Sequence, residues 1–347
     1  MLVVRAIDGA DLDGLYQLAC EVGSGMTTLK ADMQMLGERL RVACASFAET
    51  IAPAQRDYLF VMEDTDNGRL AGVCAIKGAV GLDEPFYNYR IGTLVHSSRE
   101  LGIFTRMETL YLSNDLTGST ELCSLFLHPD YRNGSNGKLL SKSRFLFIAQ
   151  FPHLFTEKLI AEMRGYQAPD GSSPFYEGLG RHFFKMDFDH VDDLTSLGKK
   201  SFIAELMPRQ PLYVAYLPDD AQQAIGKVHL STAPARHLLE QEGMHFEGYV
   251  DIFDAGPVLQ TRISELRALR DSALAVVSSD ASAQSDGVAE LRMVSNTVLN
   301  NFRMIAVTAH PVDGCIALSP FEQQALHCQG GDAVRTLTLN VRKPSHV

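Results

Sequence analysis

A short loop rich in glycine, asparagine and serine separates two segments of regular pattern. Residues 121–128 form an apolar strand-like run that ends at Pro129, and residues 138–151 carry apolar side chains at helical spacing. Between them lies Tyr131-Arg-Asn-Gly-Ser-Asn-Gly137. A strand that enters a helix N-terminus through such a loop presents several free backbone N–H groups to an anion. The spacing therefore predicts a phosphate-binding loop.

Two common nucleotide loops do not fit the sequence. The loop lacks the Gly-Lys-Ser/Thr ending of a nucleoside triphosphate loop. Gly178 and Gly180 resemble the start of a dinucleotide-binding motif, but Phe183 occupies the position of its third glycine. The phosphates must therefore belong to another kind of ligand.

His229 is a candidate for proton transfer. It follows the short segment Ile225-Gly-Lys-Val228 and precedes a helix start at Thr232-Ala-Pro234, which places it at the end of a short strand. An imidazole with an ordinary pKa of about 6.5 can take or give a proton near neutral pH. The chain has 11 histidines, so position alone fits a capping or hydrogen-bonded surface histidine as well.

The elements that position these residues predict an α+β fold. A strand over 2–7, helices after Asp8 or Asp11 and over 31–50, and a hairpin of strands 58–63 and 69–76 open the chain. Short strands follow within 81–114, then a strand over 158–165 and a helix over 174–184. The Ser/Ala-rich run at 278–287 is typical of a linker, and short strands with a helix over 320–326 follow it.

Composition narrows the function classes. The chain of 347 residues is 46% hydrophobic and 21% charged, as globular proteins are, and this excludes a disordered chain. A net charge of −11 argues against a nucleic-acid partner and suits a cationic substrate. Six cysteines without a CxxC pair are expected to be reduced core residues of a cytoplasmic protein. The sequence shows neither a signal peptide nor a membrane span, and we expect no metal site.

The loop resembles the acyl-CoA loop of the GNAT acyltransferase superfamily, Arg/Gln-x-x-Gly-x-Gly/Ala. Arg132 opens it, Gly137 closes it, and Ser135 stands where the first glycine is usual. Several longer motifs resemble the arginine N-succinyltransferase family. They are Gly25-Met-Thr-Thr-Leu29, Leu140-Ser-Lys-Ser-Arg-Phe145, Ala161-Glu-Met-Arg-Gly165, Glu205-Leu-Met-Pro208, Gly226-x-Val-His229, Thr232-Ala-Pro-Ala-Arg236, Leu239-Glu-x-Glu-Gly243 and Tyr249-Val-Asp-Ile-Phe-Asp-x-Gly-Pro257.

The resemblance implies an enlarged GNAT-like fold, a mixed and mostly antiparallel sheet flanked by helices. It also implies transfer of the succinyl group of succinyl-CoA to the α-amino group of L-arginine, with succinyl-CoA as a co-substrate and no prosthetic group. His229 matches the family's proton donor. The implied CoA contacts are the strand residues Leu125, Phe126 and Leu127 and the loop residues Arg132, Asn133, Gly134, Ser135, Asn136, Gly137 and Lys138.

The substrates' own charges need partners. A guanidinium is met by carboxylates, and those in the resembling segments are Glu162, Glu205, Asp251 and Asp254. The succinyl carboxylate needs a cation, and the sequence leaves Arg90, Lys142, Arg144 and Arg164 open.

These patterns divide the chain into a GNAT-like core over 1–277, a linker over 278–289 and a small β-barrel-like module over 290–347. Within the core, the CoA loop lies near 125–138 and a second motif block spans 226–257. Other acyl donors or amines such as ornithine, and a non-catalytic CoA-binding subunit, stay open as alternatives. We expect no membrane partner, and either a homo-oligomer or a heteromer with a related chain.

Overall fold

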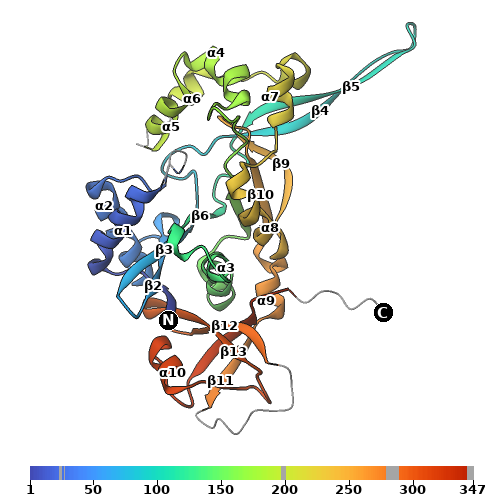
Figure 1. Cartoon of the computed structure of the whole chain (residues 1–347). Helices are drawn as coiled ribbons and strands as arrows, with labels where there is room; N and C mark the ends of the chain where they lie inside the picture. Colours follow the sequence, from blue (N-terminus) through green and yellow to red (C-terminus); the bar gives the residue numbers. More distant parts are fainter. Residues whose placement is uncertain (23–25, 27, 197–200, 279–288, 342–347) are drawn as a thin grey trace.

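One large sheet organises the chain. The computed structural model describes residues 1–347 except 23–25, 27, 197–200, 279–288 and 342–347. A mixed sheet of fifteen strands, mostly antiparallel, runs through it and is flanked by helices (Figure 1). The α+β class expected from the sequence is therefore confirmed.

The strands, in chain order, are β1 (Leu2–Ala6), β2 (Asp57–Asp64), β3 (Arg69–Lys77), β4 (Asn88–Ser98), β5 (Ile103–Ser113), β6 (Thr120–Leu127), β7 (Lys158–Glu162), β8 (Leu212–Tyr213), β9 (His245–Asp251), β10 (Pro257–Arg262), β11 (Ala273–Ser278), β12 (Glu290–Asn296), β13 (Arg303–Ala309), β14 (Cys315–Ala317) and β15 (Ala333–Thr338). Their order in the sheet is β14-β11-β15-β12-β13-β1-β2-β3-β6-β7-β10-β9-β4-β5-β8.

The helices are α1 (Leu12–Glu21), α2 (Met33–Phe47), α3 (Asn136–Gln150), α4 (Arg181–Phe184), α5 (Phe188–Ser196), α6 (Ser201–Leu206), α7 (Asp219–Ala224), α8 (Ala233–Gln241), α9 (Arg267–Asp271) and α10 (Pro320–Leu326). The Asp32 carboxylate caps α2 by accepting a hydrogen bond from the Met35 backbone N–H at 2.9 Å.

The central strands are buried on both faces. Alternate residues of β2 pack to opposite sides: Leu59 and Val61 join the cluster of α1 and α2, whereas Phe60 and Met62 join the cluster that contains α3. The sheet therefore lies between α1 and α2 on one side and α3 on the other. This layering explains the continuous apolar runs of β2 and β3.

The hairpin region and β11 differ from the sequence expectations. Residues 81–114 form one long hairpin, β4 and β5, in place of several short strands. The linker expected over 278–289 lies almost entirely in residues 279–288, outside the described part of the chain. β11 falls inside the expected core, yet it pairs with β14 and β15 of the C-terminal region. That region joins the main sheet directly, because β13 pairs with β1.

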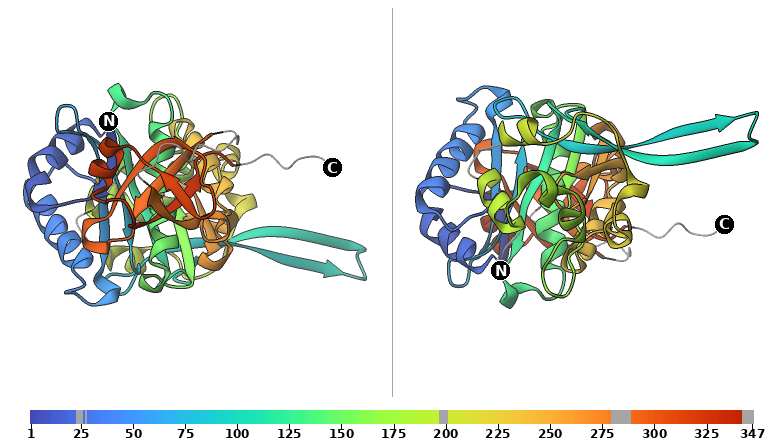
Figure 2. Two further views of the ribbon diagram at one scale, coloured as in Figure 1. Left: turned by 90° about the horizontal axis from the view of Figure 1, so that it is seen from below. Right: turned by 90° about the horizontal axis from the view of Figure 1, so that it is seen from above.

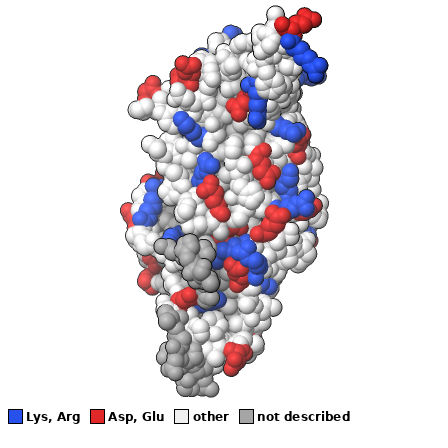
Figure 3. Space-filling model, turned by 90° about the vertical axis from the view of Figure 1, so that its right-hand side faces the viewer, with Lys and Arg blue, Asp and Glu red and all other residues white. Residues whose placement is uncertain are grey.

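The cysteines and charges are distributed as follows. All six cysteines are free thiols, and Cys74 is buried whereas Cys20 and Cys315 are exposed. Acidic and basic side chains are interspersed over the face drawn in Figure 3. None of the helices in the described residues has the length and apolar character needed to cross a lipid bilayer.

A fully buried ion cluster ties α3 to the second half of the chain. Glu242, at 0% exposure, accepts bonds from Arg267 Nη2 at 2.8 Å and lies 2.9 Å from Lys142 Nζ. Lys142 also donates to the Leu339 carbonyl oxygen at 3.1 Å. A single buried carboxylate therefore compensates two buried cations that come from different elements.

We expect Glu242→Gln to lower the free energy of unfolding by about 3–5 kcal/mol, because it leaves two buried cations without a counter-charge. Denaturant unfolding measures the loss. Glu157→Gln is the matched control, since Glu157 pairs with Arg262 at 3.3 Å on the surface, where both side chains are more than half exposed. Removing an exposed pair costs about 1 kcal/mol or less. Equal losses in the two variants would contradict this role of the cluster.

Candidate active site

One extra residue in β6 opens the middle of the sheet. Between the pairs Val73↔Phe126 and Ala75↔Cys123, two steps along β3 match three along β6, and Ser124 takes a φ of 53°. On its other edge β6 pairs with β7 in parallel, and the paired residues are Thr120 with Leu159 and Glu121 with Ile160. Beyond these pairs the described ladder between β6 and β7 ends, so the backbone around Leu125 is not taken up by β7.

The predicted phosphate loop lies at the end of β6, as the sequence indicates. Gly134 has a φ of +53°, and Ser135 is the N-cap of α3 without a side-chain capping bond within the described residues. The first-turn N–H groups of a helix point outward from its end and carry partial positive charge. The loop and the start of α3 therefore form a place where an anion can bind.

The side chains of the loop mostly hold its shape. Arg132 donates from Nε to the Leu127 carbonyl oxygen at 2.8 Å, and its guanidinium lies 5.6 Å from the centre of the Phe126 ring. The Asn136 amide donates to the Tyr131 carbonyl oxygen at 3.0 Å. Lys138 is exposed and donates to Asn340 Oδ1 at 3.3 Å. These side chains thus hold the backbone groups of the loop in place.

Arg39 stabilises the bulge from the side of α2. Its Nε donates to Asp57 Oδ2 at 2.7 Å, and its Nη1 donates to Ser124 Oγ at 2.9 Å. Ser124 Oγ in turn donates to Thr28 Oγ1 at 2.9 Å. Sequence analysis missed Arg39 and Ser124, since residues that meet over 85 positions of the chain leave no local signal. Thr28 does lie in one of the family motifs, at 25–29.

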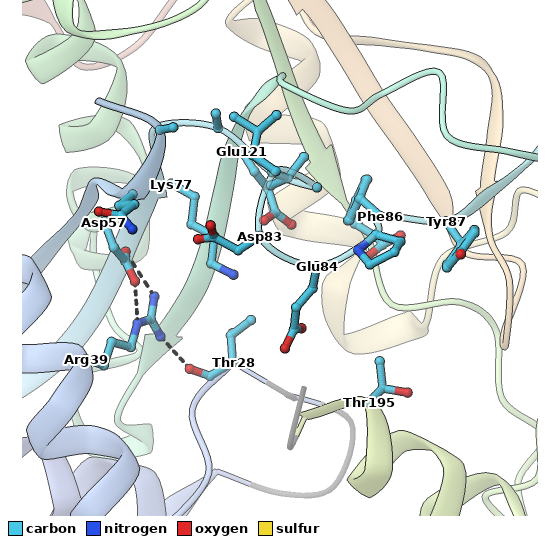
Figure 4. Close-up of a pocket in the computed structure, with 18 of the residues that line it drawn as sticks. Thr28, Arg39, Asp57, Lys77, Asp83, Glu84, Phe86, Tyr87, Glu121 and Thr195 are labelled. Carbon is cyan, nitrogen blue, oxygen red and sulfur yellow. Dashed lines mark hydrogen bonds and ion pairs between the residues drawn. The ribbon is translucent and has the colours of Figure 1, made fainter. Parts of the chain in front are cut away.

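A cavity of about 570 Å³ is lined in part by Thr28, Arg39 and Asp57 of this hydrogen-bond network (Figure 4). It lies between α2, the segment 79–87, and the ends of β7 and β9. Its charged lining residues are four cations, Lys30, Arg39, Arg56 and Lys77, and six carboxylates, Asp57, Asp83, Glu84, Glu121, Glu162 and Asp251. A mixed but carboxylate-rich cavity of this size suits a small molecule with a positive group.

Two of the four predicted carboxylates line this cavity. Glu162 accepts a bond from Asn88 Nδ2 at 3.0 Å, and Asn88 is the backbone ladder partner of Asp251. Burial and the neighbouring Asp254 carboxylate raise the pKa of Asp251. A raised pKa favours the neutral form of Asp251, and its Oδ1 accepts bonds from the backbone N–H groups of Phe253 at 2.7 Å and Asp254 at 2.8 Å. Glu162 is therefore the carboxylate that is placed to receive a cation from the cavity.

The other two predicted carboxylates lie elsewhere. Asp254 is buried, and its two oxygens accept bonds from the backbone N–H groups of Gly165 at 2.6 Å and Gly256 at 2.8 Å. The chain passes here so closely that a Cβ on Gly256 would lie 1.9 Å from the Met163 carbonyl oxygen. Asp254 thus fixes the segment after β7. Glu205 is exposed on α6 and does not line the cavity.

His229 is held at the same end of β7. Its backbone N–H donates to the Arg164 carbonyl oxygen at 2.9 Å, and the preceding residue, Val228, forms a β-bridge with Gly165. The short strand expected before His229 is therefore this single bridge. The position of the half-buried imidazole follows directly from where Asp254 holds the end of β7.

The hydrogen bonds of His229 select its tautomer. The Ser231 backbone N–H donates to Nδ1 at 3.2 Å, so Nδ1 is an acceptor and the hydrogen of the neutral ring sits on Nε2. The Ser231 hydroxyl lies 2.7 Å from the same nitrogen. Burial and the positive charge of Arg164 lower the pKa of His229, which makes its protonated form a stronger acid than free histidine.

Three of the four candidate cations are already engaged. Arg90 is exposed and lies 3.9 Å from Asp115, and Lys142 belongs to the buried cluster with Glu242. Arg144 is buried and donates to the Cys123 carbonyl oxygen at 3.4 Å. Arg164 differs from them. Its Nη2 donates to Gln167 Oε1 at 2.6 Å, but its Nε is buried without a hydrogen-bond partner among the described residues.

Comparison with known proteins decides the family. The family model described as arginine N-succinyltransferase beta subunit matches residues 2–268. The chain is 46% identical over 339 residues to arginine N-succinyltransferases of Shigella dysenteriae and of Escherichia coli K12, and the match covers 98% of each chain. The chain belongs to the arginine N-succinyltransferase family. The family expected from the sequence is thereby confirmed.

A solved relative supports the same membership. The structure of arginine/ornithine succinyltransferase subunit AI from Pseudomonas aeruginosa superimposes with a TM-score of 0.88 at 33% identity. It covers 98% of this chain and 99% of that one. The bulged strand, the loop before α3 and the cavity thus lie in a fold that this chain shares along its length with that structure.

We expect Arg164→Gln to raise the pKa of His229, since it removes the positive charge that opposes protonation of the ring. NMR titration of protein labelled with ¹⁵N-histidine measures the pKa, which in the wild type lies below about 6.5. The nitrogen shifts of the neutral ring are expected to place its hydrogen on Nε2. Lys227→Gln, a charge removal at an exposed neighbour, is the control and leaves the pKa unchanged. A His229 pKa that is insensitive to Arg164→Gln would refute the coupling.

Proposed function

We propose that the chain transfers the succinyl group of succinyl-CoA to the α-amino group of L-arginine, giving N2-succinyl-L-arginine and CoA. The observation that carries the proposal is the 46% identity, over 98% of both chains, to proteins named arginine N-succinyltransferase. The geometry supports it, because Arg39 lines the cavity and also bonds Ser124 of the bulge in β6, and the loop at the start of α3 follows the same strand.

The CoA moiety is proposed to follow the free edge of β6. The pyrophosphate binds the N–H groups of residues 133–138 at the start of α3. The pantetheine arm and the thioester lie along the backbone of Leu125, Phe126 and Leu127, which β7 leaves open beyond Glu121. A ligand can thus complete the hydrogen bonds that a neighbouring strand would otherwise make.

The reaction itself is a single acyl transfer. The neutral α-amine attacks the thioester carbonyl carbon, the C–S bond breaks, and the nitrogen loses one proton while the sulfur gains one. We assign the donation to Nε2 of the charged His229 ring, in which Nδ1–H donates to the Ser231 hydroxyl oxygen. The neutral ring that remains takes up the proton that the nitrogen loses, so the protons balance. The lowered pKa of His229 favours proton transfer from its charged form to the departing thiolate.

The acceptor is proposed to lie in the cavity. Glu162 is the carboxylate that we assign to the guanidinium, because it lines the cavity. Asp251 lines the same cavity, but its Oδ1 holds the backbone of Phe253 and Asp254, and burial favours its neutral form. Asp254 acts as a positioning residue for the end of β7. We assign no substrate contact to Glu205, since it lies on the outside of α6.

Arg164 is our candidate for the succinyl carboxylate. Its Nε is buried and without a partner in the described structure, and its charge acts on His229, beside which the acyl group must lie. A buried donor without a partner costs free energy, which an incoming carboxylate relieves. The reducing cytoplasm suits the six free thiols and is the compartment that we propose.

The activity is tested by CoA release, followed with a thiol reagent, when the purified chain meets succinyl-CoA and L-arginine. We expect release with arginine and slower release with ornithine. His229→Gln is expected to lower kcat by about 10²–10⁴-fold through loss of proton donation, whereas Lys227→Gln leaves it unchanged. A fully active His229→Gln removes the residue from the mechanism. Absence of release with either amine would favour a non-catalytic CoA-binding subunit.

Two charge-removing variants are each expected to weaken the binding of a different substrate. Arg164→Gln raises KM for succinyl-CoA by about 10–100-fold, the value of one charged hydrogen bond, and spares butyryl-CoA, which lacks the carboxylate. Glu162→Gln raises KM for arginine by about tenfold or more and leaves KM for succinyl-CoA unchanged. Steady-state kinetics with each substrate varied measures both. If either variant changed KM for succinyl-CoA and KM for arginine by the same factor, the substituted residue would not be specific to one of the two substrates.

A further inference from the structure

Lys77, at the end of β3, stands apart from the other cations that line the cavity. Arg39 donates to Asp57 at 2.7 Å, and Arg56 has a carboxylate 3.4 Å away. Lys30 is engaged as well. The side chain of Lys77 makes neither a hydrogen bond nor an ion pair with any residue that the structure describes, and it lines the same cavity. Its charge is therefore free to meet a ligand.

The half-buried Lys77 is charged in spite of its surroundings. Burial lowers the pKa of a lysine, but Glu121, Cys123 and Asp57 more than offset this and raise the pKa of Lys77 above its ordinary value. The two carboxylates belong to the neighbouring strands, since Lys77 is the ladder partner of Asp57 on β2 and of Glu121 on β6. An ammonium that keeps its charge without a direct partner retains three donor hydrogens for a ligand.

Lys77 and Glu162 lie on opposite sides of β6. The sheet order β3-β6-β7 separates their strands by two spacings, or about 10 Å. Figures 1 and 2 show the N-terminal elements, which include β3, on one side of the molecule and the hairpin of β4 and β5 on the other. In the close-up, Lys77 and Arg39 lie on one side of the cavity and Phe86 and Tyr87 on the other (Figure 4). A ligand that contacts both Lys77 and Glu162 must cross β6.

The acceptor of the proposed reaction carries the charges that this arrangement requires. L-Arginine has a carboxylate on the carbon that bears the reacting amine, and a guanidinium at the far end of a methylene chain. With the guanidinium at Glu162, the carboxylate falls on the other side of β6, where Lys77 lies. The α-amine then lies over β6, the strand that we assign to the thioester.

We propose that the Lys77 ammonium binds the α-carboxylate of the acceptor amino acid. The inference rests on the proposed function, because it takes arginine as the acceptor. Lys77 and Glu162 together set the direction in which the acceptor crosses β6, since the reversed orientation would place the guanidinium against a lysine. The site thereby selects an amino acid over an analogue without the carboxylate, which leaves the cation of Lys77 unpaired.

The succinyl group carries a carboxylate of the same chemistry. We assign it to Arg164, which follows β7 and whose charge acts on His229. Lys77 lies on β3, across β6 from that position. The acceptor carboxylate and the acyl carboxylate are therefore varied separately in the test.

The test compares L-arginine with L-argininamide, in which a neutral amide replaces the carboxylate. CoA release gives kcat/KM for each amine, and their ratio measures the preference for the carboxylate. We expect Lys77→Met to lower this ratio about 10–100-fold relative to the wild type, the value of one charged hydrogen bond. The folded fraction of a variant cancels within its ratio, and the intrinsic reactivity of each amine cancels between variant and wild type.

Two matched variants serve as controls. Lys158→Met removes an exposed lysine of β7 that does not line the cavity, and it is expected to keep the wild-type ratio. Glu162→Gln is expected to weaken arginine and argininamide by the same factor, because both retain the guanidinium. Its ratio therefore also stays at the wild-type value.

An unchanged ratio in Lys77→Met overturns the proposal. So does a variant that keeps the amine ratio and loses the preference for succinyl-CoA over butyryl-CoA, since that result places the acyl carboxylate at Lys77. If the wild type releases no CoA with arginine, the proposed function fails. The ratio is then taken from calorimetric dissociation constants of the two amines. A fall of this ratio in Lys77→Met supports the role of Lys77, and an unchanged ratio overturns it.

Discussion

The extra residue of β6 is the constraint on which the rest of the site depends. A parallel strand pair that continued past Glu121 would use the backbone of Leu125 in its own ladder. The bulge at Ser124 bends β6 away from this pairing, and it requires a left-handed conformation that a serine adopts at some energetic cost. The Arg39 guanidinium offsets that cost, because it ties the Ser124 hydroxyl to the Asp57 carboxylate and to the segment before α2. One buried cation thus shapes the strand that we assign to the thioester.

A second constraint acts on the end of β7. The Asp254 carboxylate accepts two backbone N–H groups, and the glycines at 165 and 256 let the two segments approach without a Cβ between them. The carbonyl of Arg164 is thereby presented to the backbone of His229. The proposed donor is therefore placed by backbone geometry, and its side chain is then oriented by Ser231. This explains how a histidine in a short bridge, with no regular strand around it, is held at a fixed position.

The parts of this site that could be predicted from the sequence are its local ones. The strand ending at Pro129, the loop over 131–137 and the helix after it are encoded within thirty residues and are all present in the structure. The hairpin at 64–69 is local in the same sense. Contacts across long stretches of chain could not be predicted: Arg39 with Ser124, Asp254 with Gly165, or β11 with β15. Residue type alone ranks the four carboxylates equally. Only the packing of β7 and β9 separates Glu162, at the cavity, from Asp251 and Asp254, whose oxygens accept backbone N–H groups.

The same packing places the buried cations of the chain. It explains why the cations considered for the succinyl carboxylate are not equivalent. A buried cation is stable only if a carboxylate or a set of carbonyl oxygens replaces its water. Lys142 and Arg267 share Glu242, Arg39 has Asp57, and Arg144 has carbonyl and hydroxyl oxygens of its own helix and of β6. All four hold the scaffold together. Arg164 has one amide oxygen at Nη2 and an unsatisfied buried Nε, so it retains a share of its binding capacity. The carboxylate of a succinyl group can accept a hydrogen bond from the Nε of Arg164, whereas an acyl group without a carboxylate cannot. We therefore expect selectivity for succinyl-CoA to come from Arg164, a cation that the fold leaves incompletely paired close to the proposed proton donor, His229.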